Sequence, residues 1–89
     1  MSYRIDFSPS AARDFRKFPL AVRERLRPAI DALTTDPRPR GAKAMSGWGG
    51  ALRIRVGEWR IVYRVEDEHL LVFVFVVRVG HRGDVYRVR

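Results

Sequence analysis

The chain has 89 residues and a formal net charge of +8, because 18 Lys and Arg outnumber 10 Asp and Glu. This length predicts a single domain over residues 1–89, with space for one sheet and one or two helices but not for a cofactor domain. Cysteine is absent, which excludes disulfides and thiolate chemistry. The longest apolar run, residues 70–77, is far shorter than the roughly 20 residues of a membrane span.

Other function classes lack their sequence signals. No apolar segment typical of a signal peptide stands at the N-terminus, and no glycine-rich phosphate-binding loop is present. The His, Asp and Glu residues have no spacing typical of a metal site. We therefore expect a cytoplasmic protein that needs no metal and no cofactor and does not contact a membrane.

The positive charge is carried almost entirely by arginine, since the chain has two lysines, Lys17 and Lys43. The planar guanidinium group binds phosphate through two hydrogen bonds and stacks on bases. The charge therefore indicates a polyanionic partner, either nucleic acid or an acidic protein. A GC-rich genome would also favour Arg over Lys, but it would not explain the net charge.

The N-terminal half predicts one strand and two helices. Residues 3–7 alternate between apolar and polar, as in a half-buried strand. Ser8 and Pro9 are typical of a helix start, and the first helix is expected to end near Lys17. A second helix is predicted from Pro19 to Leu33, kinked or shortened by Pro28. Its inward stripe comprises Val22, Leu26, Ala29, Ile30 and Leu33.

The C-terminal half predicts strands after a loop over residues 36–50 that is rich in Pro and Gly and has one or two ordered points. The expected strands cover residues 51–56, 59–66, about 69–79 and 85–88. The third is apolar on both faces and should lie inside the sheet. Gly57 and Glu58 fit a type II′ turn. The order β-α-α-β-β-β-β predicts an α+β fold with both helices on one face of a mostly antiparallel sheet of four to five strands.

A two-residue turn at Gly57 and Glu58 predicts the pairing across the hairpin. Arg55 then faces Arg60, and alternate side chains share a face. Directly opposed like charges destabilise a sheet, so the pair suggests an anion that binds there. The alternative is that the long side chains spread into water at little cost. The expected arginine face comprises Arg53, Arg55, Arg60 and Arg64, and the expected core face comprises Leu52, Ile54, Val56, Trp59, Ile61 and Tyr63.

The segment after the third strand carries further candidate site residues. His81 titrates near neutral pH, Arg82 is a further phosphate ligand, and Tyr86 is able to stack on a base or hold a sugar oxygen. The alternatives are a solvated turn for His81 and core packing for Tyr86.

Nearly the whole chain resembles the RelE/ParE toxin superfamily. The resemblance is carried by residues 3–11, 52–63 and 79–87. The second stretch resembles the family's signature of basic-x-basic, Gly, and then aromatic-Arg-hydrophobic-x-Tyr. It implies two N-terminal helices on a curved sheet. In RelE-like members it implies an endoribonuclease that enters the ribosomal A site and promotes attack of an mRNA 2′-OH on the adjacent phosphate.

The resemblance also implies roles for single residues. Arg55 and Arg60 would clamp the scissile phosphate, with Arg53 on a flanking phosphate. Arg82 would stabilise the leaving side, Tyr86 would orient the sugar or base, and His81 would move the proton. Further RNA contacts are expected from Arg64 and Arg87. The strand pair is commonly Lys in RelE-like members, and Arg is too basic to act as a general base.

Two other readings stay open from sequence. A ParE-like toxin shares the fold and poisons DNA gyrase without cutting RNA, and an inactive relative would only bind an antitoxin or RNA. In each toxin reading, the net charge of +8 favours an acidic antitoxin that folds on the toxin. Alternatively, the charge serves ribosome binding alone. Contact with operator DNA is expected to be indirect, through the antitoxin.

Overall fold

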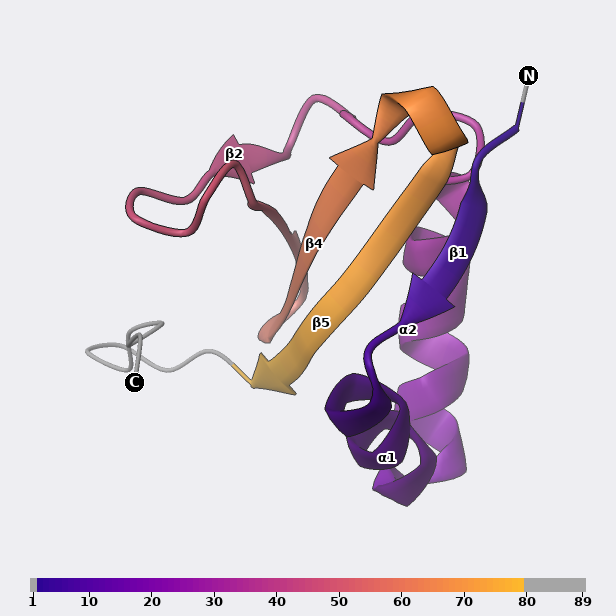
Figure 1. The fold of residues 1–89 in the computed structure, drawn as a ribbon. Helices are drawn as coiled ribbons and strands as arrows, with labels where there is room; N and C mark the ends of the chain where they lie inside the picture. The colour runs from indigo at the N-terminus through magenta and orange to yellow at the C-terminus, as the bar shows by residue number, and fades with distance from the viewer. Residues whose placement is uncertain (1, 80–89) are drawn as a thin grey trace.

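The computed structural model describes residues 2–79 (Figure 1). Two helices follow one strand, and the remaining strands follow the helices, as the sequence predicts. No helix in this range is long and apolar enough to cross a membrane. The elements are β1 (Arg4–Phe7), α1 (Pro9–Lys17), α2 (Leu20–Ala32), β2 (Lys43–Ala44), β3 (Leu52–Val56), β4 (Trp59–Glu66), a short 3-10 turn η1 (Asp67–His69) and β5 (Leu71–Val79).

The strands form one five-stranded sheet in the order β1-β5-β4-β3-β2. Strand β1 runs parallel to β5, and the other neighbours are antiparallel. The predicted interior position of the apolar strand is confirmed, because β5 lies between β1 and β4. Within the expected loop, Lys43 and Ala44 form the short strand β2 and pair with β3, in keeping with the one or two ordered points expected there. Two residues are too few for a periodic signal.

Helix α1 begins where the sequence predicts. The Ser8 hydroxyl accepts a hydrogen bond from the backbone N–H of Ala11 at 3.1 Å, and Pro9 opens the helix. Helix α2 does not end at Pro28, so the shortening expected there is absent. Pro28 is exposed, as is Glu24 one turn before it, so water is available to the carbonyl that loses its helical partner.

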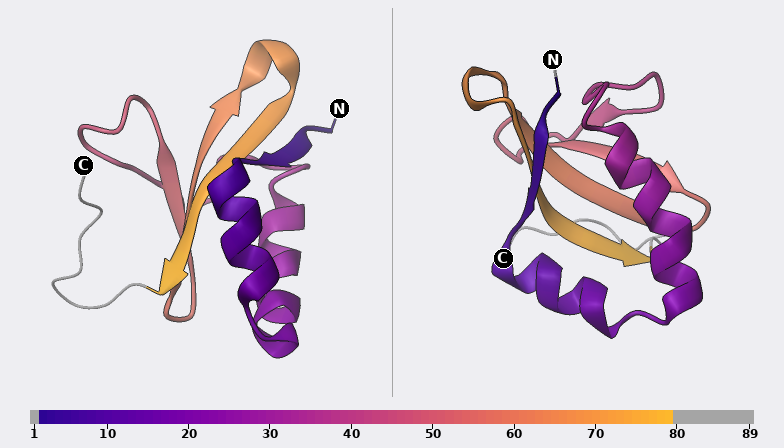
Figure 2. Two further views of the ribbon diagram at one scale, coloured as in Figure 1. Left: turned by 60° about the horizontal axis from the view of Figure 1, so that its bottom comes forward. Right: turned by 90° about the vertical axis from the view of Figure 1, so that its right-hand side faces the viewer.

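The core lies between the helices and one face of the sheet, and both helices cover that same face (Figure 2, left). The predicted inward residues of α2 are confirmed: Leu26, Ile30 and Leu33 are buried, and Val22 and Ala29 pack against them. The sheet contributes the predicted core face of the hairpin. Of that face Ile54, Ile61 and Tyr63 are buried, and β5 adds the buried Val72, Val74 and Val77.

Side-chain contacts of Tyr63 and Arg38 attach the loop after α2 to the strands and to η1. The buried Tyr63 hydroxyl donates to the Pro37 carbonyl at 2.7 Å, and burial raises the pKa of Tyr63 to about 12. Farther along, the Arg38 guanidinium binds both carboxylate oxygens of Asp67 at 3.1 and 2.8 Å, and Tyr3 donates to the same carboxylate at 2.7 Å. The hydrogen bonds from Arg38, and then from Tyr3, lower the pKa of Asp67 to about 2.

The turn between β3 and β4 has the predicted form. Gly57 has a φ of +61° and Glu58 does not have a positive φ. A type II′ turn requires this combination. The Arg25 side chain of α2 lies against Gly57 so closely that a Cβ there would overlap its guanidinium. The turn therefore needs glycine for its backbone conformation, whereas the flexible end of the Arg25 side chain could move away from a Cβ.

Candidate nucleic-acid interface

The face of the sheet opposite the helices carries the predicted arginines. The register is the one expected from the two-residue turn, with Arg55 opposite Arg60 and Arg53 opposite Val62. Arg64 lies two residues beyond Val62 and points to the same side. The prediction that these four arginines share a face is confirmed, and no helix of the described chain covers that face (Figure 2, left).

One further arginine belongs to this face. Arg78 of β5 lies directly opposite Arg60, which itself lies opposite Arg55. Three arginines from neighbouring strands therefore form a continuous row across β3, β4 and β5, which we call the arginine row (Arg55, Arg60, Arg78). Arg55 and Arg78 are exposed, and Arg60 is half-buried between them.

The pairing geometry brings these side chains close together. Val56 and Trp59 close the two-residue turn as a hydrogen-bonded pair, so Arg55 and Arg60 form the next, non-hydrogen-bonded pair, with Cα atoms about 4.5 Å apart. The backbone groups of Arg60 then face β5, where paired Cα atoms are about 5.5 Å apart. Among residues 2–79, no carboxylate lies within ion-pair distance of the row.

A β-bulge explains why sequence reasoning missed Arg78. Strict alternation through β5 would place Arg78 on the core side with Val72 and Val74. The register shifts between Val62 and Tyr63 of β4, so that Phe75 has no partner and the alternation changes phase. Arg78 then reaches the arginine face. The signal was present in the sequence as an arginine near the end of an otherwise apolar strand, where burial of an unpaired charge would be costly.

Aromatic side chains lie beside the arginines. The Arg64 guanidinium carbon is 5.7 Å from the centroid of the Phe75 ring, within the range of a cation–π contact. Phe75 is in turn stacked with Phe73 and with Trp48, at ring-centroid distances of 6.3 and 6.0 Å. The face therefore offers positive charge and half-buried aromatic surface together, the combination that single-stranded nucleic acid requires.

Four of the predicted site residues lie outside the described residues. These are His81, Arg82, Tyr86 and Arg87, together with the strand expected over residues 85–88. Their roles stay predictions. Within residues 2–79, no group of three or more His, Asp or Glu side chains could hold a metal ion.

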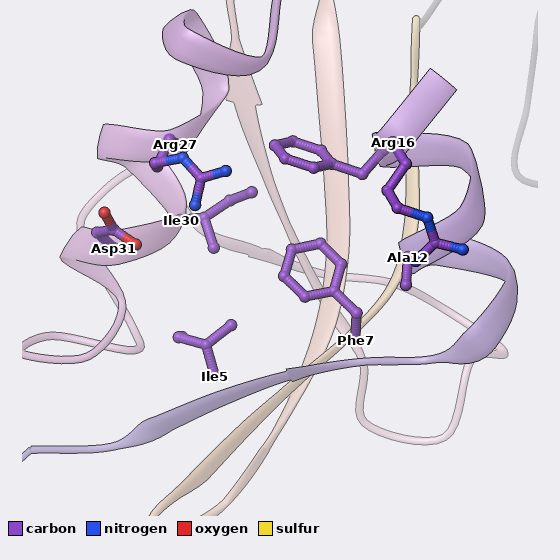
Figure 3. Close-up of a pocket in the computed structure, with 8 residues that line it drawn as sticks. Ile5, Phe7, Ala12, Arg16, Arg27, Ile30 and Asp31 are labelled. Atoms are coloured by element: carbon purple, nitrogen blue, oxygen red, sulfur yellow. The ribbon is translucent and has the colours of Figure 1, made fainter. Parts of the chain in front are cut away.

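A second concave region lies on the helix side, where β1 meets α1 and α2 (Figure 3). It is a groove of about 340 Å³, and apolar residues that include Ile5, Phe7 and Ile30 line it together with the charged residues Arg16, Arg27 and Asp31. Arg27 borders it, with its guanidinium carbon 5.6 Å from the Phe15 ring centroid. The groove therefore combines apolar surface with charged groups of both signs.

Known proteins match this chain along most of its length. A family model described as the ParE toxin of the parDE type II toxin–antitoxin system matches residues 5–86. Toxin RelG of Mycobacterium tuberculosis is 33% identical over 88 residues, which cover 98% of this chain and 99% of RelG. The mRNA interferase toxin RelE of Escherichia coli is 33% identical over 88 residues, which cover 97% of this chain and 92% of RelE.

Solved structures agree with these matches. The structure of the intact Escherichia coli RelBE toxin–antitoxin complex contains a chain that aligns with a TM-score of 0.79 and 31% identity, over 91% of this chain and 100% of that one. The chain therefore belongs to the RelE/ParE family of toxins from type II toxin–antitoxin systems.

Proposed function

We propose that this toxin is an mRNA endoribonuclease that cuts its substrate in the ribosomal A site and thereby stops translation. The arginine row carries the proposal, because it concentrates three cations, which have no ion-pair partner within residues 2–79, on one face of the sheet in a relative of the mRNA interferase RelE. For folding alone, opposed like charges are unfavourable. A bound phosphate would offset that repulsion.

The reaction needs no group outside the RNA as nucleophile. The 2′-oxygen of one nucleotide forms a bond to the adjacent phosphorus, and the bond from phosphorus to the 5′-oxygen of the next nucleotide breaks. The products are a 2′,3′-cyclic phosphate and a 5′-OH, and the proton passes from the 2′-OH to the leaving oxygen. We propose that Arg55 and Arg60 stabilise the extra negative charge of the transition state. Each fixed hydrogen-bond donor of this kind increases the rate by about 10²–10³-fold.

Proton transfer requires a different side chain, since arginine stays charged at physiological pH. We assign the transfer of the proton to His81 and the stabilisation of the leaving 5′-oxygen to Arg82. Tyr86 would orient the sugar or base. Flanking RNA is assigned to Arg53, Arg64 and Arg87. The support for these roles is the family resemblance together with the ordinary pKa of imidazole near 6.5.

We further propose that an acidic antitoxin neutralises the toxin by folding over its positively charged surface. The support is the net charge of +8 and the similarity to the toxin chain of the RelBE complex. Operator DNA would be contacted only through the antitoxin. Action on the ribosome implies that the toxin works in the cytoplasm.

Expression from a tightly controlled promoter tests the activity. The wild type should produce new 5′-OH ends inside translated codons, matched by upstream fragments with 2′,3′-cyclic phosphate ends. The Arg55→Met/Arg60→Met double variant should lose this cleavage, whereas Arg13→Met, which removes an exposed arginine of α1, should keep it. Growth arrest with intact mRNA would overturn the proposal.

A second candidate is favoured by the family model, which is described as the ParE toxin. A toxin of that kind would poison DNA gyrase by protein contact and would leave mRNA intact. The same expression experiment separates the two, because gyrase poisoning produces DNA damage and filamentous cells. Absence of toxicity in every form would instead favour a relative that only binds an antitoxin or RNA.

A further inference from the structure

We propose that Phe75, flanked by Arg64, is a stacking site for one unpaired base of the RNA substrate. This inference rests on the proposed function and extends it, because the arginine row accounts for phosphate binding but not for contact with a base. The ligand is the base of a nucleotide in single-stranded mRNA close to the scissile phosphate.

The packing of Phe75 differs from that of an ordinary core residue. The core and the described residues packed against it include neither Phe73 nor Phe75. Both rings lie on the arginine face instead, stacked at 6.3 Å with an interplanar angle of 26°, and both remain half-buried. Trp48, from the glycine-rich loop, borders Phe75 on the same face. These aromatic side chains therefore add surface to the arginine face and not to the helix-side core.

The β-bulge supports a functional reading of this position. Val62 pairs with Val76 and Tyr63 pairs with Val74, so Phe75 is the extra residue between them. Bulges are frequent next to active sites, where they redirect a side chain. Here one bulge has two effects on the same face: it leaves Phe75 unpaired beside Arg64, and it brings Arg78 into the arginine row.

The distance from Phe75 to the arginine row fits one RNA strand. Phe75 and Arg78 are three residues apart along β5, which corresponds to about 10 Å of strand. A stacked nucleic-acid strand rises about 3.4 Å per nucleotide, so a strand held at the row reaches Phe75 within a few nucleotides. Arg64 covers part of the Phe75 ring at 5.7 Å and is able to stack on a base or bind its phosphate.

Binding measurements with two RNAs test the inference. One is a short single-stranded 2′-O-methyl RNA, which cannot be cleaved by its own 2′-oxygen. The other is a series of the same RNA in which one nucleotide, at a different position in each member, lacks its base. With the wild type, loss of the base at one position should weaken binding between about 5-fold and 150-fold, the value expected for one stacked base. Equal affinity for the intact RNA and for every abasic RNA would overturn the inference.

Two variants locate the effect at Phe75. Phe75→Leu should bind the intact RNA as weakly as the wild type binds the abasic RNA that weakens its binding most. Removing the base at that position should not further change the affinity of Phe75→Leu. Phe75→Tyr, which keeps an aromatic ring, should behave as the wild type does. A Phe75→Leu protein that still discriminates between the two RNAs would overturn the assignment.

The test separates this inference from the proposed function. If Phe75→Leu binds the abasic RNA with wild-type affinity, the arginine row is intact and the variant is folded. Cleavage in cells with no base discrimination at Phe75 would reject the stacking site and leave the nuclease proposal standing. Wild-type protein that neither binds nor cleaves RNA would reject both.

Discussion

The arginine row predicts that removal of its central charge makes the protein more stable. Arg60 faces Arg55 on one side and Arg78 on the other, so Arg60→Met relieves two like-charge contacts. If each contact costs as much as other cross-strand pairs are worth, about 0.2–1 kcal/mol, the expected gain is about 0.4–2 kcal/mol. For a domain of this size, that raises Tm by about 4–8 °C per kcal/mol. Methionine keeps most of the buried stem of the half-buried Arg60, which limits the loss of packing.

Thermal and urea unfolding of matched variants measure this effect. Arg55→Met lies at the end of the row and relieves one contact, so it should gain about half as much as Arg60→Met. Arg13→Met, on the exposed surface of α1, controls for the loss of one charge from a protein of net charge +8. The gain should shrink in about 1 M salt, where the Debye length is about 3 Å.

The substitution Arg60→Met should weaken RNA cleavage and binding although it makes the protein more stable. RNA cleavage or binding by Arg60→Met should fall while Tm rises, as is common where a functional site is assembled at the expense of stability. A variant that is less stable than the wild type, or a gain that is equal in low and high salt, would refute the reasoning from like-charge repulsion.

Three further predictions concern the contacts that hold the sheet and the loops in place. Tyr63→Phe removes the donor to the buried Pro37 carbonyl and should lower the free energy of unfolding by about 1–3 kcal/mol in urea titrations; no change would mean that another donor replaces the hydroxyl. Asp67 has a folded-state pKa of about 2, below its ordinary value of 3.8, so its contribution to stability is present above about pH 4 and is lost as the pH falls toward 2. Asp67→Asn should flatten that part of the Tm-versus-pH curve, and an unchanged curve would argue against the contact with Arg38. Gly57→Ala should destabilise the hairpin by about 1–2 kcal/mol, because φ is +61° there; equal stability by calorimetry would show that the turn adopts another type.

Much of the fold was predictable because local signals and tertiary structure agree. Ser8 and Pro9 mark the start of α1 through hydrogen bonding and fixed φ, which are properties of the residues themselves. The turn at Gly57 determines the register of the hairpin and thus the opposition of Arg55 and Arg60. Pro28 does not shorten α2, because the cost of an internal proline depends on whether water reaches the helix at that point.

The sequence by itself determined which hairpin arginines share a face, since alternation along a strand follows from backbone geometry alone. Only the tertiary structure decided that Arg78 joins them and that Phe75 lies beside Arg64. Both depend on the bulge in β5, which is set by how β4 and β5 pair and by which side chains the helices bury. A one-residue shift of this kind reverses the faces of a strand without changing its composition or hydropathy, and so no periodicity in the sequence reveals it.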